Sequence, residues 1–147
     1  KLLEFNCRFG DPEAQVLLPL LDCDVVSLMR DCAQGTLDPE SVCWKAKSAA
    51  TVVLASGGYP LKYEQGFPIS GIEAVETLDD CKVYQAGTRF DGEQIVTSGG
   101  RVLCVTALGD ELESALESAY AGIQQVSFEG AQYRQDIGQT VTRKGKR

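Results

Sequence analysis

The sequence predicts an α+β protein in which two short helices precede a mostly antiparallel β region that carries one packed helix. Three observations support this prediction. Apolar residues recur at helical spacing between residues 11 and 34, β-rich runs separated by glycine-rich turns fill residues 49–109, and an amphipathic stretch follows at 111–125. Neither an internal repeat nor a low-complexity segment is present.

The first ten residues alternate in the manner of a β-strand. The apolar face of this strand would consist of Leu3, Phe5, Cys7 and Phe9. The opposite face would carry a carboxylate, an amide and a guanidinium, from Glu4, Asn6 and Arg8. A polar face that can bind a metal would therefore run directly into the next element.

Two helices are expected next. In the first, over residues 11 to about 21, Asp11 can cap the N-terminus, Pro12 suits the first helical position, and Pro19 should end or kink the helix. The second is an amphipathic helix over Asp24–Gln34.

A domain boundary is expected just after the second helix. Gly35 is the natural C-terminal stop of that helix, and the proline-containing segment Thr36–Glu40 is typical of a linker. We therefore divide the chain into residues 1–36 and 37–147.

The following region has β character. Its expected strands are Ala49–Ala55, Lys82–Phe90, Gln94–Thr97 and Arg101–Leu108. Asp91-Gly92 is a hairpin turn signal between the middle two. Asp110 is then expected to cap the helix over 111–125, whose apolar stripe is Leu112, Leu116, Ala119 and Ile123. Residues 126–138 mix a short strand with polar residues.

The composition is that of a folded globular protein, with 44% hydrophobic and 24% charged residues. The net charge of -7 argues against general affinity for nucleic acid, and no stretch approaches the roughly 20 apolar residues that cross a bilayer. Histidine is absent and the six cysteines form no C-x-x-C pair, so a zinc site is not expected. We expect reduced core cysteines, as in a cytoplasmic protein, and a hard, oxygen-bound cation if a metal binds. Because the chain begins at Lys1, with no methionine and no signal peptide, we expect a piece of a longer polypeptide.

Glu4 and Asn6 are the candidate metal ligands. Side chains two apart on a strand point the same way with roots separated by roughly 7 Å, so a carboxylate and an amide oxygen could share one Mg²⁺ or two adjacent ions. The alternative is an ordinary solvent-exposed strand face. Arg8 could brace a phosphoryl group, or could form an ion pair with Asp11 or Glu13. Asp11 could cap a helix and also present its carboxylate to a bound ammonium group.

The turn Ser98-Gly99-Gly100-Arg101 connects two predicted strands and ends in a cation. Such a turn can expose backbone N–H groups to an anion, so Gly99, Gly100 and Arg101 are candidate substrate-binding residues. It can equally be a plain hairpin connection.

The string RFGDPEAQ at residues 8–15 resembles the signature of the glycinamide ribonucleotide synthetases, also called phosphoribosylamine–glycine ligases, of the ATP-grasp superfamily. Further blocks resemble consecutive parts of the C-terminal portion of that family, in the order LEFNCRFGDPE, VVLASGGYP, TSGGRVLCVTALG, AYAGIQQVSFEGAQYR and QDIG. The resemblance runs from Leu2 to Gly138. Leu61, where the family often has glycine, and the tail after Gly138 depart from the pattern.

The resemblance implies an ATP-dependent ligation in purine synthesis. ATP phosphorylates the carboxylate of glycine, and the amine of 5-phosphoribosylamine attacks the glycyl phosphate, which gives glycinamide ribonucleotide, ADP and phosphate. Mg²⁺ or Mn²⁺ at the nucleotide phosphates would be held by Glu4 and Asn6. Arg8 and Asp11 would be catalytic, near the transferred phosphoryl group and the glycine respectively.

The resemblance also implies an architecture. Residues 1–36 would be the last strand and helices of an ATP-grasp domain, and 37–147 the small C-terminal domain that packs against the remaining domains of the same enzyme. Such a fragment should be inactive alone, because metal ligands without a nucleotide cleft cannot position ATP. Two rivals stay open: a biotin-carboxylase-like ATP-grasp enzyme that activates bicarbonate, and a non-catalytic binding module that retained the fold.

Overall fold

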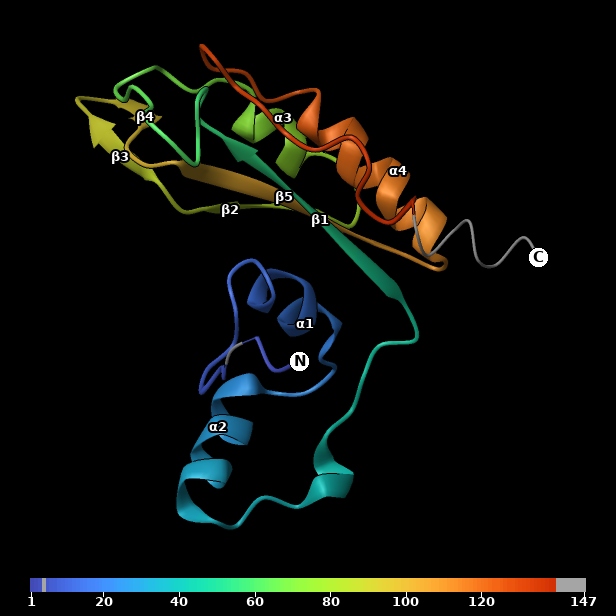
Figure 1. Ribbon diagram of the computed structural model, residues 1–147. Coiled ribbons are helices and arrows are strands. Elements are labelled where there is room, and N and C mark those ends of the chain that lie inside the picture. The colour runs from blue at the N-terminus through green and yellow to red at the C-terminus, as the bar shows by residue number, and fades with distance from the viewer. Residues whose placement is uncertain (4, 140–147) are drawn as a thin grey trace.

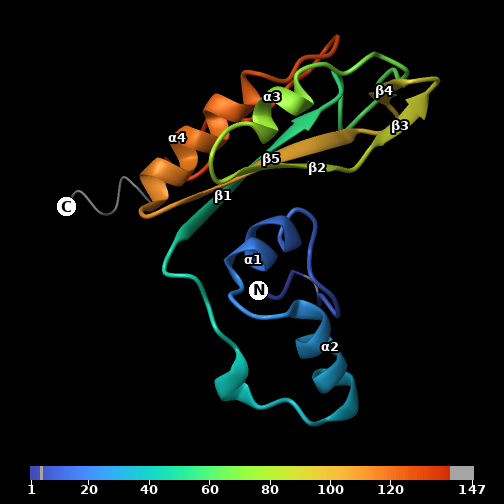
Figure 2. The same ribbon diagram turned by 180° about the vertical axis from the view of Figure 1, so that it is seen from behind.

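The computed structural model describes residues 1–3 and 5–139 and arranges them in three layers (Figure 1). A sheet forms the middle layer, helices α3 and α4 cover one of its faces, and α1 lies against the other (Figures 1 and 2). The helices are α1 (Ala14–Leu20), α2 (Val25–Gln34), the 3₁₀ helix η1 (Pro39–Ser41), α3 (Ile72–Glu76) and α4 (Leu112–Ile123). The strands are β1 (Ser48–Ala55), β2 (Cys81–Gln85), β3 (Thr88–Asp91), β4 (Gln94–Thr97) and β5 (Arg101–Gly109).

The central strand of the larger sheet is β5, which pairs antiparallel with β1 on one side and with β2 on the other. Val105 is level with Val52 on β1 and with Val83 on β2, so the apolar runs of the three strands are in register. Segments that contain many β-branched residues favour such a pleated, buried surface. The strands predicted over 49–55 and 101–108 are therefore confirmed.

The strand predicted over residues 82–90 is instead two strands, β2 and β3, separated near Gly87. Gly87 lies against the backbone of Gly99, and an added Cβ there would come within 2.7 Å of the Gly99 Cα atom. Only glycine tolerates this approach, so the break falls at Gly87. β3 then pairs with β4 in the predicted hairpin, whose two-residue turn begins at Gly92 with φ +61°.

The core lies between the sheet and α4. It consists mainly of aliphatic side chains from β1, β5 and α4, among them Val52, Leu54, Leu103, Val105, Ala115, Ala119 and Ile123. Gly122 allows α4 to approach the sheet closely, because a Cβ there would lie 2.9 Å from the Val105 Cγ1 atom. The predicted apolar stripe is confirmed at Ala119 and Ile123, which are fully buried.

The helix α4 begins one residue later than predicted. The backbone N–H of Glu111 donates to Ser114 Oγ (3.3 Å), and that hydroxyl donates to the Glu111 carbonyl (2.8 Å). Glu111 is therefore the N-cap residue, and the prediction that Asp110 caps the helix is wrong. After α4 the chain forms two isolated antiparallel bridges, Ser127 with Ser70 and Gln132 with Ala55, in place of the predicted short strand.

The opening residues do not form the predicted strand. Residues 1–3 and 5–10 are irregular, and Leu3 and Phe5 are 94% and 82% exposed instead of lining a covered apolar face. A strand is stable only when a neighbouring strand pairs with it, and the described residues place no strand alongside this segment.

The two N-terminal helices match their predictions unequally. The helix α1 starts at Ala14, and Glu13 accepts a backbone N–H of the preceding loop on Oε2 (2.7 Å). The helix α2 follows its prediction closely: Asp24 Oδ1 accepts the Val26 N–H (3.0 Å), and Gly35 ends the helix at φ +69°.

The chain between the helices and the sheet is tied back to α1. As predicted, α1 ends at Leu20, directly after Pro19. The segment predicted as a linker, 36–40, contains most of η1, and the Lys45 N–H then donates to the Leu20 carbonyl (2.8 Å) before β1 begins.

All six cysteines are free, but the prediction that they are core residues is correct only for Cys81 and Cys104. The exposed or half-buried ones are Cys7, Cys23, Cys32 and Cys43. These four cysteines lie outside the sheet and α4. They belong to the N-terminal part of the chain, in which neither α1 nor α2 contains a buried residue. None of the described helices has the length and apolar character needed to cross a membrane.

Candidate functional site

Two predicted site residues that are 90 positions apart in sequence meet in the structure. The guanidinium of Arg101 donates from Nη2 to Asp11 Oδ2 (3.0 Å) and from Nη1 to the Asp11 main-chain carbonyl (2.7 Å). Gln15 donates from Nε2 to the other carboxylate oxygen, Asp11 Oδ1 (2.9 Å). The predicted capping role of Asp11 is therefore wrong, because Glu13 is the N-cap residue and the Asp11 carboxylate binds these two side chains instead of a backbone N–H of α1.

Asn6 and Arg8 lie together on the exposed loop before Asp11. Arg8 donates from Nη1 to Asn6 Oδ1 (3.2 Å) and to a neighbouring main-chain carbonyl (3.0 Å). The sequence left open an ion pair between Arg8 and Asp11 or Glu13. The described residues contain no such ion pair. The amide and the guanidinium predicted to share one face are thus neighbours, although the segment is a loop.

Of the two predicted metal ligands, Glu4 and Asn6, the structure describes only Asn6. Glu4 lies outside the described residues, as does the divergent tail at 140–147. In the described part of the chain no three His, Cys, Asp or Glu side chains gather into a group that could hold a metal. Mg²⁺ does not require such a group, since it binds through one or two protein oxygens and completes its shell with water and phosphate. The exposed amide oxygen of Asn6 fits that chemistry.

The glycine turn before β5 is packed against the loop that follows β1. Ser56 donates from its backbone N–H to the Gly100 carbonyl and from Oγ to the Gly99 carbonyl, both at 2.8 Å. Gly100 lies against the ring of Tyr59, so a Cβ there would overlap the ring. The N–H groups of Gly99 and Gly100 have no hydrogen-bond acceptor among the described residues. The turn is therefore held to the loop after β1 through its two carbonyls.

Polar side chains are also buried or half-buried within the sheet. Thr106 donates from Oγ1 to Thr51 Oγ1 (2.8 Å) across the β1–β5 pair. Burial raises the pKa of the Cys104 thiol and also raises the pKa of the Tyr84 hydroxyl. Because the thiolate is the reactive form of cysteine, the burial that raises the pKa of Cys104 disfavours that form.

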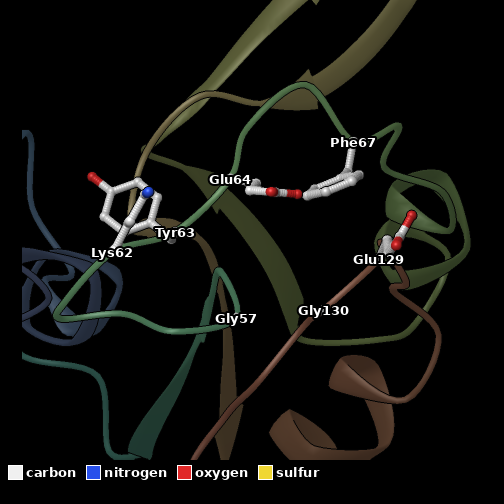
Figure 3. A pocket seen from close by; sticks show the side chains of 7 residues that line it. All are labelled: Gly57, Lys62, Tyr63, Glu64, Phe67, Glu129 and Gly130. Atoms are coloured by element: carbon white, nitrogen blue, oxygen red, sulfur yellow. The ribbon is translucent and has the colours of Figure 1, made fainter.

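Sequence reasoning missed a hollow of about 450 Å³ beside the end of β1 (Figure 3). Its lining residues are Gly57, Lys62, Tyr63, Glu64, Phe67, Glu129 and Gly130. Figure 3 shows Lys62 and Tyr63 on one side of the hollow and Glu129 on the other. The sequence signal that could have indicated it is the pair of glycine turns, since a Cβ on Gly57 would lie 2.9 Å from the Gly130 carbonyl oxygen.

Residues 49–140 match the family model described as "Phosphoribosylglycinamide synthetase, C domain". The chain belongs to the phosphoribosylglycinamide synthetase family. The resemblance found in the sequence is confirmed, and so is the α+β fold with an antiparallel C-terminal domain and a packed helix.

Named relatives extend this match over almost the whole chain. A phosphoribosylamine–glycine ligase of Nostoc sp. is 50% identical over 145 residues, which are 96% of this chain and 33% of the relative. A bifunctional purine biosynthetic protein of Dictyostelium discoideum is 49% identical over 139 residues, 94% of this chain and 17% of that protein. The crystal structure of the Thermotoga maritima phosphoribosylamine–glycine ligase matches with a TM-score of 0.78 and 34% identity, over 92% of this chain and 32% of that one. The chain thus spans about a third of the length of the single ligases that it matches.

Proposed function

We propose that the chain is the C-terminal part of an ATP-dependent phosphoribosylamine–glycine ligase. The observation that carries the proposal is the extent of similarity: two relatives named as this ligase are 50% and 49% identical over 96% and 94% of the chain. The similarity therefore extends beyond residues 49–140, the range of the C-domain family model.

In the proposed reaction ATP transfers its γ-phosphoryl group to the carboxylate of glycine, which yields ADP and glycyl phosphate. The amine of 5-phosphoribosylamine then attacks the acyl carbon, and inorganic phosphate leaves as the amide forms. Arg8 would contact the transferred phosphoryl group, because a guanidinium fork suits charge spread over several oxygens. Asp11 would face the ammonium group of glycine. Support for these roles comes from their shared loop and from the exposure of both side chains.

The proposed cation is Mg²⁺ or Mn²⁺, held by Glu4 and Asn6. A bound cation would neutralise charge on the ATP phosphates during transfer. The contact between Asn6 Oδ1 and Arg8 Nη1 supports this arrangement, because it places a hard oxygen donor beside the residue proposed to meet the phosphoryl group.

The proposed substrate-binding segment is Gly99, Gly100 and Arg101. The Gly99 N–H, which has no acceptor among the described residues, and the guanidinium donors of Arg101 that Asp11 does not use suit an anionic group of a substrate. We also propose that residues 1–36 complete an ATP-grasp domain and that 37–147 form the C-terminal domain of a cytoplasmic enzyme. On this proposal the 147 residues alone are inactive, since the remaining domains supply the nucleotide cleft.

The test is phosphate release by the full ligase polypeptide that carries this chain. We expect release that requires ATP, glycine, 5-phosphoribosylamine and a divalent cation, and that bicarbonate does not support. Release that depended on bicarbonate would favour a biotin-carboxylase-like enzyme, and no release with either substrate would favour a non-catalytic module.

The metal ligand is tested in the same assay with Asn6→Ala. We expect this change to raise the Mg²⁺ concentration needed for half-maximal rate at least several-fold, because one of the protein oxygens is lost. Gln94→Ala, which removes an exposed amide from the β3–β4 hairpin, is the matched control and should leave the Mg²⁺ dependence unchanged.

A further inference from the structure

The carboxylate of Asp11 is held from two sides. Arg101 binds Oδ2 and also the main-chain carbonyl of the same residue, while Gln15 binds Oδ1. Two donors of one planar guanidinium on one residue restrain both the side chain and the peptide that carries it. The orientation of the Asp11 carboxylate is therefore set by its partners and not by the loop alone.

The two partners differ in how firmly they are anchored. Gln15 belongs to α1, which lies against the sheet but contains no residue classed as buried. Arg101 is the first residue of β5, directly before a run of buried residues that pairs on both sides. The residue before it, Gly100, is fixed by the Ser56 N–H (2.8 Å) and by the ring of Tyr59. The hydrogen bonds from Arg101 thus connect Asp11 to the well-packed sheet.

We propose that Arg101 is a positioning residue for the ligase, which acts by aiming the Asp11 carboxylate at the ammonium group of glycine. This inference rests on the proposed function, in which Asp11 meets glycine. Without Arg101, Gln15 alone holds Asp11, through a single oxygen. The carboxylate then samples orientations that do not meet the ammonium group, and glycine binds less productively. ATP binding does not pass through this contact and is unaffected.

The test is a double-mutant cycle in the full ligase, with Asp11→Asn, Arg101→Met and the two combined. Since a misplacement of about 1 Å can cost up to roughly 100-fold in rate, we expect Arg101→Met alone to lower kcat/KM for glycine by roughly 10- to 100-fold. The KM for ATP should stay within about twofold. In the Asp11→Asn background Arg101→Met should cost several-fold less than in the unmodified ligase, because the group that Arg101 aims is already neutral and only the substrate contact proposed for Arg101 above is lost.

Two further variants separate positioning from stability. Arg89→Met is the matched control, since Arg89 is also an exposed arginine paired with an aspartate (Asp91, 3.6 Å) but lies on β3 away from the loop. It should leave kcat/KM for glycine unchanged. Arg101→Lys keeps the charge but loses the two-pronged contact, so it should recover only part of the loss. Urea unfolding midpoints of all variants identify any that fail to fold.

A loss from Arg101→Met of the same size in both backgrounds would overturn the inference, and so would a parallel rise in KM for ATP and for glycine. If Arg101→Met fails to fold, Arg101→Lys and its combination with Asp11→Asn provide the same comparison. Failure of the proposed function has a different signature, because the unmodified ligase would then show no glycine-dependent phosphate release.

Discussion

The N-terminal helices and the central strand of the sheet differ in how deeply their residues are buried. In α1 and α2 no residue is buried, and the loop before them exposes apolar side chains such as Leu3 and Phe5. In β5 seven of the nine residues are buried, and the strand pairs with neighbours on both sides. Candidate chemistry is concentrated in the first region, and packing energy in the second.

This difference shows how a loop with little packing of its own can still hold a defined geometry. Arg101 reaches from the start of β5 to Asp11, and α1 lies against the sheet (Figure 1). The C-terminal region therefore acts as a frame, and the N-terminal region carries side chains that the frame orients. Variants that affect one region and not the other should reveal this division.

The largest expected contrast is between two glycines that both have positive φ. Gly71 (φ +87°) precedes α3 and lies against the backbone of Gln125, so that an added Cβ would overlap the Gln125 carbonyl, whereas Gly35 (φ +69°) has nothing within 4 Å. We expect Gly71→Ala to lower the free energy of unfolding by roughly 2–4 kcal/mol, from overpacking together with left-handed strain. Gly35→Ala should cost only about 1 kcal/mol, from strain alone. Urea unfolding followed by circular dichroism measures both values.

Equal losses for the two glycine variants would remove the distinction between the regions. A loss for Gly71→Ala that was smaller than that for Gly35→Ala would mean that the junction between α3 and the end of α4 yields easily. The C-terminal region would then be less rigid than the burial of β5 indicates.

A smaller effect is expected from acid on α2. The Ser27 hydroxyl, which donates to Asp24 Oδ2 (2.7 Å), and the Val26 N–H hold the pKa of Asp24 below its ordinary value of 3.8. Because the folded-state pKa lies below the unfolded one, Asp24 stabilises the helix above the unfolded value, and this contribution is lost as pH falls through the folded value. We expect the α2 amides to lose protection from hydrogen exchange below about pH 4 while those of β5 do not.

Asp24→Asn is the matched control for the acid effect, because asparagine also caps helices but does not titrate. Protection of α2 in this variant should be independent of pH in the same range. A pH dependence that persisted with asparagine would assign the effect to another carboxyl group.

Much of the fold could be predicted because its signals are local. Asp24 and Gly35 define α2 through side-chain and backbone preferences that act within one turn. The strands around Val52 and Val105 follow from largely apolar runs that contain several β-branched residues. Misplacement of a helix start by one residue, as with Glu111, is usual where neighbouring acidic residues can all cap.

The remaining errors share a physical cause, which is that distant partners decide the outcome. Residues 1–10 alternate like a strand, but no described strand lies beside them. Gly87 breaks a predicted strand because Gly99 lies against it. For the site, residue types were predicted from the loop itself, whereas the contact between Asp11 and Arg101 spans 90 positions without any periodic signal.

The most direct test of the division into frame and oriented loop is native-state hydrogen exchange on the 147-residue chain. We expect β5 amides to exchange only through global unfolding, and α2 amides to exchange through local opening at a much lower free energy. Exchange of α2 and β5 with the same free energy and the same denaturant dependence would contradict this division, since the chain would then unfold as one cooperative unit.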